Sequence, residues 1–161
     1  MRVRSSKVAD YCVRDVVTDE REAPAVTCAR RMHDAHVGSL VVVEQRAGLN
    51  VPVGMITDRD IAIEVVAFGL DPEGTVAGDL MPPDLALARE DDDLFEVLAT
   101  MRAYGVRRLP VVDAAGALAG IVSADDLWEV LADELDGLVR VMKAEQSRER
   151  VTRTAGESKM E

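Results

Sequence analysis

The chain has 161 residues, of which 48% are hydrophobic and 30% are charged, and its formal net charge is −11. This apolar content excludes a wholly disordered chain, and the acidic balance with only 3% aromatic residues argues against a general nucleic-acid binder. No apolar run approaches the roughly 18 residues of a membrane span, and neither a signal peptide nor a cysteine framework is visible, so the sequence predicts a reduced, cytoplasmic protein.

The first half of the chain predicts a short lead-in around residues 10–12, then helix, strand, strand and helix. Pro24 suits the first turn of the first helix. Small or apolar side chains recur on one face of that helix at Ala25, Ala29 and Met32. The apolar runs Leu40–Val43 and Pro52–Ile56 are typical of strands. A second helix is expected from Asp58 to Phe68, with Gly69 as the glycine that ends it.

The second half predicts the same order of elements. Asp93 and Glu96 have the spacing of a capping box, and the helix that they start should end near Gly105. Strands are expected at Leu109–Val112 and Leu118–Val122. The last helix carries a long apolar stripe formed by Leu127, Leu131, Leu135, Leu138 and Met142. The polar residues after position 146 predict either a frayed tail or a continuation of this helix.

The two halves are copies of one unit. At an offset of 69 residues Met32 matches Met101 and Val42 matches Val111, and after residues 44–50 the offset falls to 66. That segment is a predicted hairpin tip, where insertions cost little. A unit of about 60 residues is marginal by itself. We therefore predict an α/β fold in which two units, residues 8–70 and 76–140, intertwine around one core, each with a small sheet flanked by helices, followed by a helix extension or flexible tail at 141–161.

A motif repeated in both units carries the chemical signal: glycine, two apolar residues, a hydroxyl residue, two variable residues and aspartate, at residues 54–60 and 120–126. It predicts a strand that runs into a helix N-terminus, where free N–H groups favour an anion. The hydroxyl of Thr57 or Ser123 can bind a phosphate oxygen, and the carboxylate of Asp60 or Asp126 can accept ribose hydroxyls. One copy alone is also typical of an ordinary capping box; the repetition favours a nucleoside phosphate site.

With these motifs, the strand Val106–Val112, the lead-in at 79–81 and the linker at 69–72, the chain resembles a tandem pair of CBS domains over about residues 8–140. It is similar to stand-alone CBS-pair proteins of actinobacteria. The resemblance implies a non-catalytic regulatory protein that binds an adenosyl ligand, such as AMP, ATP, NAD or S-adenosylmethionine, in clefts between the repeats. It also implies no required cofactor, a homodimer formed through the CBS helices, and an unidentified regulated protein, with neither nucleic acid nor membrane as a partner.

Carried over residue by residue, the resemblance implies two clefts. The first is expected to join Thr57 and Asp60 with segments 16–18 and 37–40, and the second to join Ser123 and Asp126 with segments 85–87 and 106–110. Arginine suits a phosphate because its guanidinium donates several hydrogen bonds in a fixed fork. The expected ligand-binding residues are Thr18, Val37, Ser39, Thr57, Arg59, Asp60, Val106, Arg107, Arg108, Pro110, Ser123 and Asp126.

Two other functions stay open. One is a structural or stress-response dimer whose clefts are closed by side chains and hold no ligand. The other is a metal-linked redox sensor that uses Cys12, Cys28, His33 and His36. Their spacing matches no closed zinc pattern, and both cysteines are expected to pack in the interior, so no metal site is predicted. No catalytic residue is predicted either, since nothing marks a base for Ser123 or Cys28.

Overall fold

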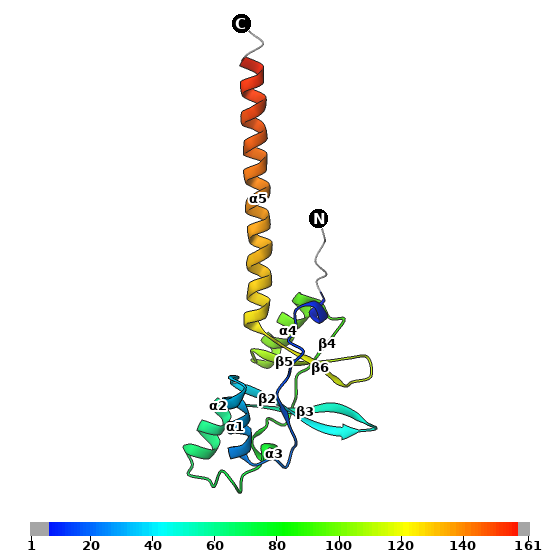
Figure 1. Ribbon diagram of the computed structural model, residues 1–161, viewed down its shortest axis with the longest axis vertical. Coiled ribbons are helices and arrows are strands. Elements are labelled where there is room, and N and C mark those ends of the chain that lie inside the picture. Colours follow the sequence, from blue (N-terminus) through cyan, green and yellow to red (C-terminus); the bar gives the residue numbers. More distant parts are fainter. Residues whose placement is uncertain (1–6, 158–161) are drawn as a thin grey trace. The chain divides into compact units, whose positions relative to one another are not determined.

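The computed structural model describes residues 7–157, with side chains described up to Gln146 and at Arg148 (Figure 1). The chain divides into two compact units, Met1–Ala124 and Asp125–Glu161. The first repeat contains η1 (Val8–Asp10), β1 (Thr18–Asp19), α1 (Ala25–Asp34), β2 (Ser39–Arg46), β3 (Leu49–Thr57), α2 (Asp58–Asp60) and η2 (Ile61–Val66). The second contains α3 (Ala77–Leu80), β4 (Ala88–Arg89), α4 (Leu94–Tyr104), β5 (Arg108–Val112) and β6 (Leu118–Ser123), and α5 (Ala124–Glu157) follows.

Each repeat forms one three-stranded sheet, ordered β1-β2-β3 and β4-β5-β6. In both sheets the short first strand is parallel to the second, and the second and third strands are antiparallel. The register of the antiparallel pair shifts between Val42 and Val43 in the first sheet and between Val111 and Val112 in the second. These positions are equivalent in the repeat, so the two copies share even this irregularity. The predicted α/β fold of two repeats, each with a small sheet and helices, is confirmed.

The two hairpins differ in length, as the change of offset predicts. In the first repeat the strands extend to Arg46 and start again at Leu49, so the turn has only two residues. Both have left-handed backbones, with φ of 51° at Ala47 and 81° at Gly48, which matches the twist of a tight hairpin. The second hairpin turns over residues 113–116, where Asp113 Oδ1 accepts the N–H groups of Ala115 and Ala117.

The helix ends follow the predicted sequence signals. Asp93 Oδ1 accepts the backbone N–H of Glu96 at 2.9 Å, and Glu96 Oε2 accepts that of Asp93 at 2.8 Å, which is a full capping box. Gly105 ends α4 with φ of 66°. Its equivalent after α1 is His36, which has φ of 54° although it is not glycine. His36 therefore occupies a helix-ending position that glycine fills in the other repeat.

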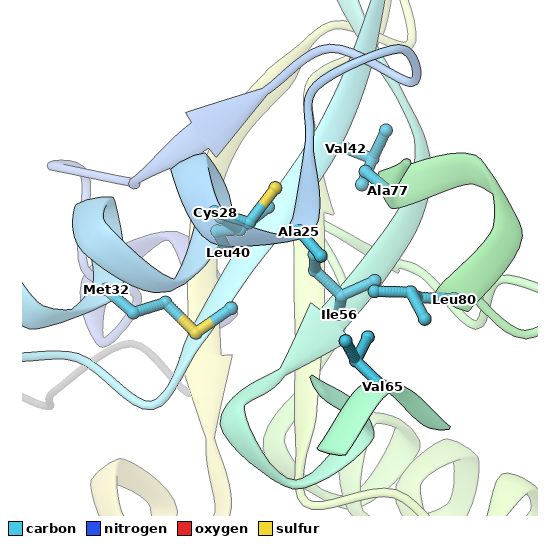
Figure 2. Close-up of a cluster of buried hydrophobic side chains, with 9 residues drawn as sticks. All are labelled: Ala25, Cys28, Met32, Leu40, Val42, Ile56, Val65, Ala77 and Leu80. Atoms are coloured by element: carbon cyan, nitrogen blue, oxygen red, sulfur yellow. The ribbon is translucent and has the colours of Figure 1, made fainter. Parts of the chain in front are cut away.

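The core of the first repeat lies between its sheet, α1, η2 and α3 (Figure 2). Ala25, Cys28 and Met32 of α1 are buried there beside Leu40 and Ile56 of the sheet. Ala77 and Leu80 also belong to this cluster, although α3 is the lead-in of the second repeat. The N–H of Ala77 donates to Ala23 O, and that of Gly78 donates to Arg21 O, both at 2.8 Å.

The lead-in of the first repeat makes the reciprocal contact with the second repeat. Val8 is fully buried, and its N–H donates to Asp92 O at 2.9 Å. Val13 and Ile121 exchange two backbone hydrogen bonds of 2.8 and 2.9 Å. Arg14 donates to Glu90 Oε1 at 2.5 Å and to Ala119 O at 3.1 Å. The repeats have thus exchanged their lead-in segments, and neither completes its own packing alone.

Two local features differ from the expectations. The strands β1 and β4 are two residues long, and each pairs with one parallel neighbour. Two residues are too few to show the alternation of apolar and polar side chains by which a strand is recognised in the sequence. The helix expected from Asp58 to Phe68 consists of the short α2 and then π-helical turns in η2, where Ala67 N–H reaches back five residues to Ala62 O. Gly69 follows with φ of 65°, as predicted for a glycine after a helix.

The second unit is formed by α5, a helix of 34 residues. It continues through the polar segment after Gln146, where a frayed tail was the other expectation, up to Glu157; residues 158–161 of that segment lie outside the described residues. Among the described residues, no helix is long and apolar enough to cross a membrane.

Candidate functional site

A cleft of about 330 Å³ lies between the two repeats of the first unit. Its wall from the first repeat is the end of β3 and the start of α2, at Met55 and residues 57–60. The wall from the second repeat consists of residues 82 and 84–86, before β4, and residues 105–108, between α4 and β5. A cavity of this size is in the range of small-molecule sites, about 300–1,000 Å³.

Thr57 and Asp60 form a reciprocal capping box at the edge of this cleft. Thr57 donates to Asp60 Oδ2 twice at 2.8 Å, from its N–H and from its hydroxyl, while Asp60 N–H donates to Thr57 Oγ1 at 3.2 Å. Within the described part of the chain, the bonds recorded for this carboxylate all involve Oδ2. The motif is therefore a capping box and a part of the cleft wall at once.

Three arginines line the same cleft: Arg59 from α2, Arg107 from just before β5, and Arg108 from its first position. Three carboxylates, Asp58, Asp60 and Asp84, line it too, so its formal charge is balanced. Asp58 Oδ1 accepts the N–H of Arg59 at 2.8 Å. The cleft can offer donors to a phosphate and acceptors to hydroxyl groups at the same time.

The remaining wall is apolar. Met55, Leu85, Ala86 and Val106 contribute apolar side chains, and Val106, which lies just before β5, is 39% exposed. Val106 takes its position from the end of α4, since its N–H donates to Met101 O at 3.0 Å beyond the left-handed Gly105. A flat apolar group can pack between these side chains.

Six of the twelve expected ligand-binding residues meet in this one cleft: Thr57, Arg59, Asp60, Val106, Arg107 and Arg108. The grouping differs from the expectation, since Thr57 and Asp60 were assigned to one cleft and residues 106–108 to the other. The start of the helix after β3 lines the same cleft as the segment before β5, and this relation between the repeats is not revealed by an offset within the sequence.

The other expected residues lie elsewhere. Val37 is 40% exposed, while Ser39 and Pro110 are buried within β2 and β5. Ser123 is half-buried at the end of β6, opposite Arg108 in the sheet, and Asp126 belongs to α5 in the second unit.

Thr18 lines a separate hollow of about 420 Å³ with Asp19, Arg31 and three residues of the β2–β3 hairpin. Asp19 is already bonded there, because its Oδ2 lies 2.9 Å from Arg31 Nε and its Oδ1 accepts the N–H of Glu20 at 3.0 Å. These contacts tie β1 to α1, which gives Asp19 and Arg31 a structural role.

Sequence reasoning missed five cleft residues: Met55, Asp58, Pro82, Asp84 and Gly105. Asp84 had a signal, since it is the repeat counterpart of Asp15. Pro82 had none, because its place follows from the exchanged lead-in, in which Met81 packs against the first repeat.

The cysteines are held apart by the fold. Cys28 is fully buried in the first repeat, and burial together with the nearby Asp19 carboxylate raises the pKa of its thiol to about 11. Cys12 is half-buried in the exchanged lead-in, with its sulfur against Gly120 of the second repeat. Over the described residues, no three histidine, cysteine, aspartate or glutamate side chains come together as a metal site.

Comparisons with known proteins agree with this architecture. The family model described as CBS domain matches twice, at residues 8–67 and 77–132. An uncharacterized protein of Methanopyrus kandleri is 37% identical over 128 residues, which cover 80% of this chain and 64% of that relative. The chain thus spans somewhat less than two thirds of the length of that relative.

A second relative is the hypoxic response protein 1 of Mycobacterium tuberculosis, which is 33% identical over 72% of this chain and 77% of its own length. A crystal structure of Hypoxic Response Protein I with two coordinated zinc ions superposes with a TM-score of 0.67 at 29% identity, covering 76% of this chain and 97% of that one. A CBS domain protein of Pyrobaculum aerophilum complexed with AMP has a TM-score of 0.67 over 74% of this chain and 88% of its own, at 24% identity, which is a likeness of fold.

Proposed function

This chain belongs to the CBS-domain family, as a tandem pair, and from that premise we propose that it is a non-catalytic regulatory protein that binds an adenosyl ligand between its repeats. The observation that carries the proposal is the convergence of Thr57, Asp60 and three arginines on one cleft that also has an apolar wall. Its ligand class is AMP, ATP, NAD or S-adenosylmethionine. The AMP complex of the Pyrobaculum aerophilum protein supports an adenine nucleotide first.

Each part of such a ligand has a counterpart in the cleft. The adenine ring suits the aliphatic wall around Leu85 and Val106, and the ribose hydroxyls suit Oδ1 of Asp60. The phosphate suits Arg107, Arg108 and Arg59, since guanidinium groups bind phosphate oxygens in pairs. Because the cleft has walls from both repeats, a bound ligand stabilises one relative packing of them, and that shift is the signal passed to a regulated protein.

Isothermal titration calorimetry with AMP, ADP, ATP, NAD and S-adenosylmethionine tests the proposal. We expect millimolar or tighter binding of at least one ligand, and a loss of at least tenfold in affinity in Asp60→Ala. Arg107→Ala should weaken the phosphate-bearing ligands and leave S-adenosylmethionine almost unchanged, since that ligand has no phosphate. No heat with any of the five ligands at millimolar concentration would refute the proposal.

Glu96→Ala is the matched control for Asp60→Ala. Glu96 makes the same bond in α4 as Asp60 makes in α2, from a third-position carboxylate to the N-cap N–H, but it does not line the cleft. Both variants lose the bond from the third-position carboxylate to the N-cap N–H, so both should lose a similar amount of stability. Only Asp60→Ala should lose ligand; equal affinity in the two variants would remove the binding role from Asp60.

The family resemblance also implies a homodimer through the CBS helices, and exposed apolar side chains on the first unit support one. Val66, Phe68 and Phe95 are each more than 70% exposed, on or just after η2 and on α4. The alternative function, a structural or stress-response dimer without a ligand, uses the same surface and predicts the dimer but no calorimetric signal. The regulated protein and a cytoplasmic location remain expectations.

A further inference from the structure

The first sheet has an open edge along the second half of β2. On one side β2 pairs with β3 over its whole length. On the other side it pairs with β1 only at Val41 and Val42, because β1 ends at Asp19. The segment Val43–Arg46, about 13 Å of strand, therefore has paired residues on a single side. It belongs to the cyan hairpin that extends away from α1 in Figure 1.

The backbone groups of Gln45 point to this open side. Val41 donates its N–H toward β1, to Val17 O at 3.0 Å. Successive residues of a strand direct their backbone groups to opposite sides, so Val43 and Gln45 share the side of Val41. The bulge does not disturb this order along β2, since its extra residue is Val53 in β3. Gln45 thus offers one N–H and one C=O to a further strand.

A hollow of about 420 Å³ lies where β1 leaves this edge. Its wall includes Asp19 of β1, Glu20 just after it, and Val43 and Gln45 of β2. Asp19 pairs opposite Val42, a core residue, so its side chain lies on the core face of the sheet. Val43 and Gln45 have odd positions in the alternation and lie on the other face. The hollow therefore reaches around the edge of the sheet, where an added strand would run.

In the second repeat the same edge is closed. The equivalent strand β5 ends at Val112, and Glu90 N–H donates to Val112 O at 3.0 Å just beyond β4. The equivalent residues of the first repeat are Arg21 and Val43, and among the described residues Arg21 N–H makes no bond to Val43 O. The open edge is thus a property of the longer first hairpin and is not required by the fold.

The charges at the edge favour a polar, basic segment. Glu44 and Arg46 pair with each other at 2.8 Å, and charges on an edge strand disfavour the addition of an apolar strand. In the hollow Asp19 is neutralised by Arg31, whereas the exposed Glu20 carboxylate has no hydrogen bond or ion pair within the described part of the chain. One negative charge is therefore uncompensated, which favours a lysine or arginine in the added segment.

We propose that the open edge Val43–Arg46 is a docking site for an extended, basic segment of a partner protein, which adds to the first sheet as a strand beside β2. Backbone hydrogen bonds to Gln45 hold this segment, and the hollow takes one of its basic side chains beside Glu20. The hollow and the ligand cleft share no residue, so either function can fail without the other.

Phage display of random heptapeptides against the full-length chain tests the chemistry of the segment. We expect the selected peptides to be enriched in lysine and arginine. Synthetic copies are then N-methylated at alternate amides, one copy at the odd and one at the even positions. One of the two should bind at least tenfold more weakly in fluorescence polarisation, because its paired edge loses the donors. A selection without basic enrichment, or equal binding of both copies and the unmodified peptide, overturns the proposal.

Gln45→Pro and Gln45→Thr are a matched pair of variants for the edge itself. Both lose the side-chain hydrogen bond with Asn50, but only proline removes the N–H that faces the open side. Proline is tolerated on an edge where that N–H does not serve the sheet, so both variants should fold and melt alike. Gln45→Pro should weaken the selected peptide at least tenfold, and Gln45→Thr should bind it as the wild type does. Equal affinity in the two variants would exclude strand addition.

Glu20→Lys tests the charge in the hollow, with Glu22→Lys as its control, since Glu22 is an exposed acid that does not line the hollow. Only Glu20→Lys should weaken the basic peptide; an equal loss in both variants would mean that net charge alone attracts it. Sedimentation velocity of the chain without peptide tests the other occupant. Self-association that Gln45→Pro abolishes would place a second copy on the edge and overturn the proposal.

Discussion

Asp60 shows how one side chain can satisfy a structural rule and remain available to a ligand. Its Oδ2 accepts both the N–H and the hydroxyl of Thr57, which fixes the carboxylate against the first turn of α2. A side chain held in this way loses little further freedom when a ribose hydroxyl binds, so the cap also prepares the site. The capping box and the binding motif are therefore two uses of the same residues and do not exclude each other.

Cys28 is the residue for which pH dependence can be predicted. Its thiol has a pKa raised to about 11 from the ordinary 9, mainly because burial disfavours the thiolate. Above pH 9 the unfolded chain releases this proton while the folded chain keeps it, so unfolding becomes easier as pH rises from 9 to 11. The stability lost is about 1.4 kcal/mol for each pH unit in this window.

Cys28→Ala isolates that contribution from the other groups that titrate at high pH. Urea unfolding at pH 8 should show the wild type more stable than the variant, because the buried sulfur packs in the core of the first repeat. The difference should shrink or reverse by pH 10.5. A difference that stays constant between the two pH values would show that the thiol ionises equally in both states.

At the scale of elements, the exchanged lead-ins explain the glycine of the repeated motif. A Cβ on Gly54 would overlap the sulfur of Met81, and a Cβ on Gly120 would lie 2.8 Å from Cys12 Sγ and 2.9 Å from Val13 O. In each repeat the third strand thus needs a glycine where the lead-in of the other repeat crosses it. The motif residue that the sequence associates with ligand binding has a packing role.

We expect alanine substitutions of Gly54 and Gly120 to differ in how far a second substitution restores the stability that they cost. Gly54→Ala and Gly120→Ala should each cost about 1–3 kcal/mol of unfolding free energy, because the added methyl group overpacks the crossing. Met81→Ala should relieve the cost of Gly54→Ala, since every close atom there belongs to the Met81 side chain. Cys12→Ala should relieve Gly120→Ala only partly, because the carbonyl oxygen of Val13 remains.

Denaturant unfolding of the two double-mutant cycles measures this contrast. Equal rescue in both cycles would mean that the backbone at Val13 can move aside. No rescue in either would mean that the lead-ins contribute nothing to the penalty.

These elements also show how far the sequence could be interpreted. The capping box at Asp93, the glycine ends at positions 69 and 105 and the longer first hairpin were predictable, because each depends on residues close in the chain. Part of the cleft lining was predictable by residue, but its grouping was not, since the offset between the repeats does not show that Asp60 and Arg107 line the same cleft. The strands β1 and β4 were not predictable, because two residues carry no periodicity.

At the scale of the whole molecule, the net charge of −11 opposes the approach of the proposed anionic ligand. A field of that sign repels a phosphate at long range, and at 0.15 M salt it is screened beyond about 8 Å. A phosphate bound in the cleft, as proposed, would lie closer than that to the three arginines that line it. Local cations therefore decide the affinity, while the acidic surface lowers the rate of encounter and keeps polyphosphate chains away.

The same cleft makes a prediction about cooperativity. A ligand that touches β3 on one side and β5 on the other stabilises both repeats together, and at a hundred times its Kd it adds about 2.7 kcal/mol to the free energy of unfolding. Hydrogen exchange with saturating AMP, or with whichever ligand calorimetry identifies, should slow the amides of β3 and β5 by similar factors. Asp60→Ala at the same ligand concentration should show smaller changes, since a tenfold loss of affinity lowers the added stability to about 1.4 kcal/mol. Protection confined to one repeat would mean that the ligand contacts a single wall, and the repeats would then not be coupled through the cleft.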